Sequence, residues 1–170
     1  MNSHLKMPLI AVSLLITALS ATHASAEMPT GLAVPDAITV ATLHAEGAQI
    51  YECKPGADSK PVWQFREPIA ALVQDGKTVG RHYAGPNWEH MDGSALRGKA
   101  AATARGATPN DIPWLKLDVT EHHGEGTFST VTTVQRINTK GGMAQGPCET
   151  AGTYQSVAYS ADYVFLRKSN

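Results

Sequence analysis

Two cysteines constrain the fold of this chain more than any other feature of its sequence. Cys53 and Cys148 are its only cysteines, and neither has a second cysteine or a histidine at metal-ligand spacing. In an oxidising compartment, a disulfide is the default for such a pair. The bridge would close a loop of roughly 95 residues and stabilise the fold by on the order of 4 kcal/mol, less any native strain. Two free thiols or a metal site are the alternative interpretations.

The first 26 residues have the composition of an export signal. Lys6 supplies the positive charge, residues 8–19 form an apolar run that is too short to span a bilayer, and residues 24–26 (Ala-Ser-Ala) form a cleavage site. An uncleaved membrane anchor is the alternative. We therefore expect residues 1–26 to be a cleaved signal helix. Residues 27–170 should then form a single globular domain in the periplasm or outside the cell.

The charge balance narrows the range of partners. The chain has 14 basic and 15 acidic residues, and only Lys6 lies in the signal. A nearly neutral chain without a basic run argues against nucleic acid or an anionic membrane as a partner. No later apolar run approaches membrane length, so we expect no membrane association in the mature form.

Short β-rich segments alternate with turn residues along the rest of the chain. Pro29 and Pro35 favour an extended strap over residues 27–36, and Asp75-Gly76 and Asp92-Gly93 are tight-turn pairs. Residues 94–108 fit either an edge strand or a small helix. The segments that we expect to form strands are 38–43, 48–54, 62–66, 70–74, 78–83, 114–120 and 154–166.

Residues 127–140 give two conflicting signals. Their threonines and valines favour a strand. A spacing of three between apolar residues favours a helix, with Thr127 as N-cap and Gly141-Gly142 as C-cap. The residues with this spacing are Phe128, Val131, Val134 and Ile137. The sequence therefore predicts a mainly β, antiparallel sandwich or partly closed barrel with one helix near 127–140.

Several motifs together resemble a known family of secreted proteins. They are residues 50–53 (Ile-Tyr-Glu-Cys), 82–89 (His-Tyr-Ala-Gly-Pro-Asn-Trp-Glu), 112–115 (Ile-Pro-Trp-Leu) and 134–142 (Val-Gln-Arg-Ile-Asn-Thr-Lys-Gly-Gly). The chain is similar here to the bacterial and fungal family catalogued as domain of unknown function 3455. The resemblance covers nearly all of residues 27–170. It implies export and supplies no catalytic residue.

Residues 80–98 concentrate aromatic, histidine and carboxylate side chains between glycines. Together with polar groups near residue 136, they are the mixture expected of a small-molecule or carbohydrate cleft. The candidate ligand-binding residues are His82, Tyr83, Trp88, Glu89, Trp114, His122 and Arg136. The alternative is that the tryptophans are core residues and that Arg136 forms a structural ion pair with Glu52 or Asp118.

Catalytic and metal sites are weaker alternatives. A metal-binding protein or metal-dependent enzyme could use His82 and His122, but no pair of ligands shows a recognised spacing. A serine hydrolase could use Ser94 or Ser129, but no nucleophile elbow is present. A glycosidase could pair Glu89 with Asp92 or Glu121. The other groups of ligand type are His90, His123 and Glu125.

The interpretation that these patterns favour is a non-catalytic protein that binds a small molecule or a carbohydrate. We expect no cofactor and no catalytic residue. A structural or stress-associated interaction protein without a pocket is the further alternative.

Overall fold

The computed structural model of the protein describes residues 27–169, and eight strands make up most of this range. The predicted signal segment lies outside the described residues. The strands are β1 (Ala37–Pro55), β2 (Pro61–Gln74), β3 (Lys77–Tyr83), β4 (Asn87–His90), β5 (Ala95–Ala104), β6 (Trp114–His123), β7 (Thr133–Gly141) and β8 (Tyr154–Lys168).

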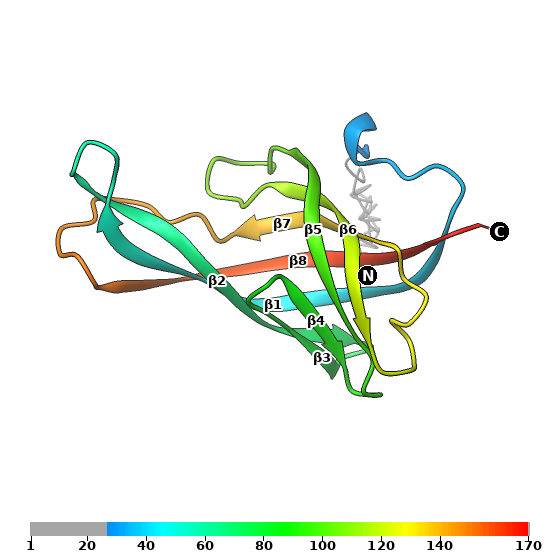
Figure 1. Ribbon diagram of the computed structural model, residues 1–170. Helices are drawn as coiled ribbons and strands as arrows, with labels where there is room; N and C mark the ends of the chain where they lie inside the picture. The colour runs from blue at the N-terminus through cyan, green and yellow to red at the C-terminus, as the bar shows by residue number, and fades with distance from the viewer. Residues whose placement is uncertain (1–26, 170) are drawn as a thin grey trace, which may run out of the picture.

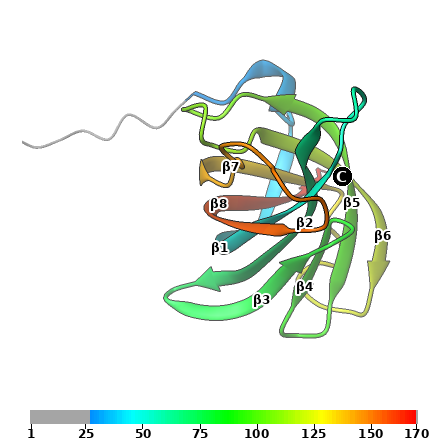
Figure 2. The same ribbon diagram turned by 90° about the vertical axis from the view of Figure 1, so that its left-hand side faces the viewer.

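The strands form one antiparallel sheet that closes into a ring. Each strand pairs with the next one along the chain, and β8 pairs back with β1 from Ala37↔Lys168 to Glu52↔Tyr154. Figure 2 shows the ring from one end, and Figure 1 shows it from the side. The prediction of a mainly β, antiparallel fold is confirmed. In the part of the chain that the structure describes, all the strands belong to this one sheet, so the two separate sheets of a sandwich are not formed.

The predicted helix near 127–140 is wrong. Residues 133–141 are strand β7, in which Val134 pairs with Phe165. Phe128 and Val131 are buried from a turn that precedes the strand. The spacing of three thus spans a turn and a strand. A register shift after Ile137, where Asn138 has φ of 51°, removes the alternation that would have identified β7.

The structure also decides between the two conformations considered for residues 94–108, an edge strand and a small helix. Residues 95–104 form β5, which lies between β4 and β6 and is therefore not an edge strand. Two register shifts along its pairing with β6 explain why the alanine-rich segment gives no clear period.

Aromatic and aliphatic side chains fill the ring. Trp88 is 1% exposed and meets the rings of Tyr163 and Phe165 edge-on, at centroid distances of 5.4 and 6.3 Å. Phe165 stacks on Phe128 at 4.3 Å. Burying one such side chain stabilises the fold by about 2–3 kcal/mol. This cluster is the core from which the pocket described below opens.

The lead-in segment packs on the outer face of the sheet. It contains a short 3-10 turn, η1 (Thr30–Leu32), and the side chain of Leu32 is fully buried. The amide of Gln135 on β7 donates to the carbonyl of Leu32 at 2.6 Å. The extended strap predicted for residues 27–36 is thus present, with one tight turn inside it.

The predicted disulfide is confirmed. Cys53 on β1 bonds to Cys148 in the loop between β7 and β8, with the two Cα atoms 5.7 Å apart. A backbone hydrogen bond joins the same two segments, in which the N–H of Gly152 donates to the carbonyl of Cys53 at 2.9 Å. This end of β1, β2 and β8 extends beyond the rest of the ring, to the left in Figure 1. The bridge therefore fastens a long loop to the projecting end of the sheet.

Candidate functional site

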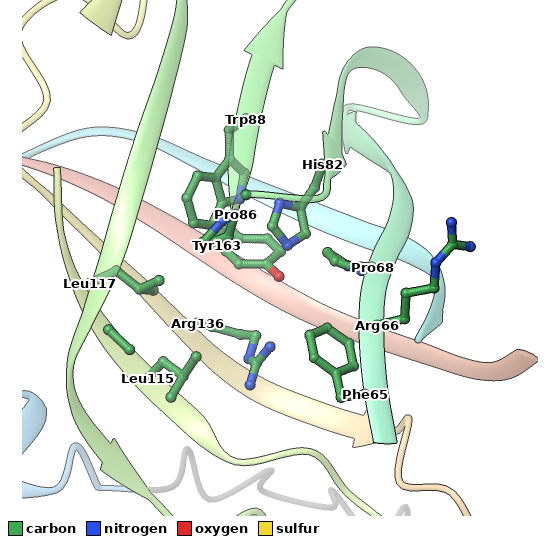
Figure 3. Close-up of a pocket in the computed structure, with 12 residues that line it drawn as sticks. Phe65, Arg66, Pro68, His82, Pro86, Trp88, Leu115, Leu117, Arg136 and Tyr163 are labelled. Carbon is green, nitrogen blue, oxygen red and sulfur yellow. The ribbon is translucent and has the colours of Figure 1, made fainter. Parts of the chain in front are cut away.

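A pocket of about 300 Å³ opens beside Trp88. Residues from seven strands, β2 to β8, and from the β3–β4 turn line it, and Figure 3 shows their side chains. Most of the wall is apolar, and its larger members are Phe65, Pro68, Pro86, Trp88, Leu115 and Leu117. The volume is at the lower end of the range for small-molecule sites.

The β3–β4 hairpin supplies one wall. His82 and Trp88 are a cross-strand pair, and their rings stack at 4.5 Å with 13° between the planes. The turn between them carries Gly85 at φ of 143°, where an added Cβ would collide with the side chain of Asn87. Glycine is therefore required there, and the tight turn brings Pro86 to the pocket.

His82 is a neutral hydrogen-bond acceptor in this wall. Its Nδ1–H donates to the carbonyl of Asn87 at 2.8 Å, which leaves Nε2 without a proton. Burial lowers the pKa of His82 to about 3, although the bond to Asn87 opposes this shift, and the charge of Arg136 lowers it further. One ring nitrogen faces the hydroxyl of Tyr163 in Figure 3.

Tyr163 places a second polar group in the pocket. Its ring lies 5.0 Å from that of His82, and its hydroxyl is 3.5 Å from the hydroxyl of Tyr159. Burial raises the pKa of Tyr163, although the charge of Arg136 and the hydroxyl of Tyr159 oppose the shift. Tyr163 is thus a neutral hydroxyl near physiological pH.

Arg136 on β7 is the third polar group. Its Nε and Nη2 donate to the carbonyl of Pro113 at 3.1 and 2.8 Å. No carboxylate in residues 27–169 forms a salt bridge with it, and Glu52 pairs instead with Lys54 at 2.9 Å. The ion pair considered from the sequence is therefore not formed.

The second arginine at the pocket differs from the first. The head group of Arg66 points away from the cluster in Figure 3. It pairs with Glu67 at 2.9 Å and lies over the ring of Tyr154. Of the two arginines, only Arg136 directs its charge toward the pocket.

The structure brings three of the seven candidate residues together, namely His82, Trp88 and Arg136. Tyr83 and Glu89 lie on the opposite face of the β3–β4 hairpin. There Arg81 pairs with Glu89 at 2.7 Å, and its guanidinium lies over the ring of Tyr83. These two residues belong to a surface cluster and not to the pocket.

Trp114 and His122 also lie outside the pocket. Trp114 has the opposite parity on β6 to the pocket residues Leu115 and Leu117, so it faces the other side of the sheet. The Nε2–H of His122 donates to the carbonyl of Val131 at 2.7 Å and holds the turn before β7.

Sequence reasoning missed Phe65, Pro68, Leu115, Leu117 and Tyr163. In the sequence, Leu115 and Leu117 share one face of a predicted strand, as do Tyr163 and Phe165, and this alternation is the signal that could have indicated an inward face. No sequence signal distinguished a pocket wall from the core.

The residues considered for catalysis have structural partners. Ser94 and Thr127 both donate to Asp92, and these bonds hold the pKa of Asp92 well below its usual range although burial opposes the shift. Ser129 donates to the carbonyl of Gly126. Glu121 approaches Arg97 at 3.5 Å.

Within residues 27–169, no three His, Cys, Asp or Glu side chains come close enough together to hold a metal ion. Nor does any helix of that range have the length and apolarity to cross a membrane.

The comparison with known proteins identifies a family. No curated protein matches the chain significantly, and no solved structure does. A family model described as "Protein of unknown function (DUF3455)" matches residues 35–167. This span contains the whole pocket and both cysteines, and it agrees with the resemblance in the sequence motifs. The chain therefore belongs to the DUF3455 family.

Proposed function

We propose that the protein is a non-catalytic binding protein for a small molecule, which it holds in the pocket beside Trp88. The observation that carries this proposal is the pocket itself, in which three polar groups meet an apolar wall. Binding sites for small molecules have this composition, because the apolar wall supplies affinity and the few polar groups fix orientation.

The polar groups favour binding over catalysis. A general base works best when its pKa lies near the operating pH, and the pKa of His82 is about 3. Tyr163 keeps its proton for the reason given above. In the described chain, neither the hydroxyl of Ser94 nor that of Ser129 has a hydrogen bond to a histidine ring. The pocket lining thus offers fixed donors and acceptors but no activated nucleophile.

The alternatives have less support. The metal interpretation needs His82 and His122 together, but each ring donates to a different carbonyl, and His122 does not line the pocket. A structural protein without a ligand gives no reason for a pocket beside Trp88. The small volume and the single arginine facing it also favour a small molecule over a carbohydrate chain.

The disulfide bears on the compartment in which the protein acts. A disulfide is compatible with an extracellular location, because such bonds persist in oxidising compartments. We infer that residues 1–26 direct export and that residues 27–170 act as a single binding domain in the periplasm or outside the cell.

A blocking substitution tests the proposal. Ala100 is exposed, lines the pocket and pairs across the strands with Leu117. Ala100→Phe fills the pocket from its mouth and leaves the buried core unchanged. Ala101→Phe is the matched control, because Ala101 is an exposed neighbour that does not line the pocket.

The measurement is ligand-observed NMR with benzyl alcohol, a neutral probe that fits the volume. We expect the probe to bind the unmodified protein and Ala101→Phe with equal affinity. Binding should weaken at least tenfold in Ala100→Phe. Failure of the probe to bind, or equal binding to all three proteins, would overturn the proposal.

A further inference from the structure

We propose that the pocket selects a small organic monocarboxylate, with the carboxylate at Arg136 and an apolar body against Trp88 and Pro86. This inference rests on the proposed function and names the chemical class of its ligand. Three features of the site carry it, namely the unpaired charge, the placement of acceptors and the volume.

The unpaired charge is the strongest of these features. Arg136 is half-buried, and no described carboxylate neutralises it. No aspartate or glutamate lines the pocket. An anionic partner would stabilise a partly buried guanidinium, since burying a charge without one is unfavourable. Its bonds to the carbonyl of Pro113 hold the planar group in place, and a fixed guanidinium can bind a carboxylate through two parallel hydrogen bonds.

The charge of Arg136 acts throughout the pocket. It lowers the pKa of His82 beyond the effect of burial, and it opposes the rise that burial causes in the pKa of Tyr163, Tyr159 and Tyr51. All four groups are neutral near pH 7. An entering ligand therefore meets one positive charge without a compensating negative one. A dianion such as a phosphate monoester would leave one of its own charges uncompensated.

The acceptors orient the ligand. The free Nε2 of His82 repels a carboxylate oxygen, because both are acceptors. The anionic end is consequently directed to Arg136. The body of the ligand then lies against the apolar wall, where Leu115 and Phe65 flank the guanidinium in Figure 3.

The volume limits the size of the ligand. A space of about 300 Å³ corresponds to roughly ten water-sized groups at about 30 Å³ each. A monocarboxylate of this size carries one ring or a short branched chain. Benzoate, with its neutral isostere benzamide, is a suitable pair of probes.

The test compares the two probes by NMR titration at pH 7. We expect benzoate to bind the unmodified protein at least about tenfold more tightly than benzamide, as a charge-assisted hydrogen bond would require. Arg136→Gln, which keeps an amide donor for the carbonyl of Pro113, should bind both probes equally. Arg136→Lys should keep a reduced preference for benzoate.

A matched control is Arg81→Gln. Arg81 is exposed on the outer face of β3, where it pairs with Glu89. This variant removes one positive charge without changing the pocket, and the preference for benzoate should be unchanged.

The outcomes separate this inference from the proposed function. If both probes bind equally to the unmodified protein, and Ala100→Phe removes both, the pocket binds small molecules but the carboxylate class is wrong. A preference that persists in Arg136→Gln would also overturn the inference. If neither probe binds, the proposed function fails together with it. If Arg136→Gln binds neither probe, its near-UV circular dichroism shows whether the pocket has collapsed. In that case, the binding of the two probes to Arg136→Lys decides whether the positive charge sets the preference for benzoate.

Discussion

Acidification below pH 6.5 should destabilise the protein through His82. The imidazole is 3% exposed, and its pKa falls from 6.5 in the unfolded chain to about 3 in the folded protein. Between these values the unfolded state binds a proton that the folded state does not, so stability decreases as the pH falls. The loss approaches about 1.4 kcal/mol per pH unit below pH 6.5. It amounts to about 2.7 kcal/mol at pH 4.5, a substantial part of a typical unfolding free energy of about 5–15 kcal/mol.

The assay is equilibrium urea unfolding from pH 7.5 to 4.5, compared between the unmodified protein and His82→Asn. Asparagine places an N–H near the position of the ring Nδ1–H that bonds to Asn87, but it does not titrate. Groups other than His82 titrate in both proteins and cancel in the difference. We expect the difference in unfolding free energy to shrink by about 2–3 kcal/mol across this range. A difference that stays constant with pH would refute the argument that burial keeps His82 neutral.

Three further predictions concern the framework around the site. Asp92→Asn should lower the urea midpoint at pH 7. Because the folded pKa of Asp92 is depressed, its stabilisation decreases progressively below about pH 4, so the gap between the two midpoints should narrow steadily from about pH 4 to about pH 2. Reduction of the bridge between Cys53 and Cys148 should lower the unfolding free energy by about 4 kcal/mol. A mass gain of two hydrogens would verify that the bridge is reduced, and an unchanged urea midpoint in the reduced protein would contradict the predicted loss of stability. Trp88→Ala should reduce stability by about 3–5 kcal/mol, because Trp88 is 1% exposed, whereas Met91→Ala, at a residue 74% exposed, should change the melting temperature little.

Most strand positions could be predicted from the sequence, because turn pairs such as Asp75-Gly76 separate alternating segments, but the order that closes the ring could not. The helix prediction failed for a physical reason. The apolar spacing across Phe128, Val131 and Val134 comes from a turn joined to a strand, and a single chain gives no sign that tertiary pairing will decide between the two patterns.

The candidate site was predictable by residue type but not by placement. His82, Trp88 and Arg136 were selected because they are aromatic or polar residues in suitable segments, and they line one pocket. Trp114 has the same chemical character, but the strap that contains Leu32 gives the outer face of the sheet a buried layer of its own. Register shifts, such as the one between Ala100 and Ala102, change which side chains face inward, and these shifts depend on pairing between distant strands.

The pairing of β1 with β8 determines when the chain can complete its fold. On one side, residues 37–52 pair with residues 154–168, so the first strand cannot be covered there until almost the whole chain has been synthesised. Contacts of such long sequence separation make folding slow. Until β8 arrives, β1 and β7 each present an open edge to other chains. A protein with this topology folds late relative to its own synthesis or translocation, and the interval before ring closure is when it is most susceptible to aggregation.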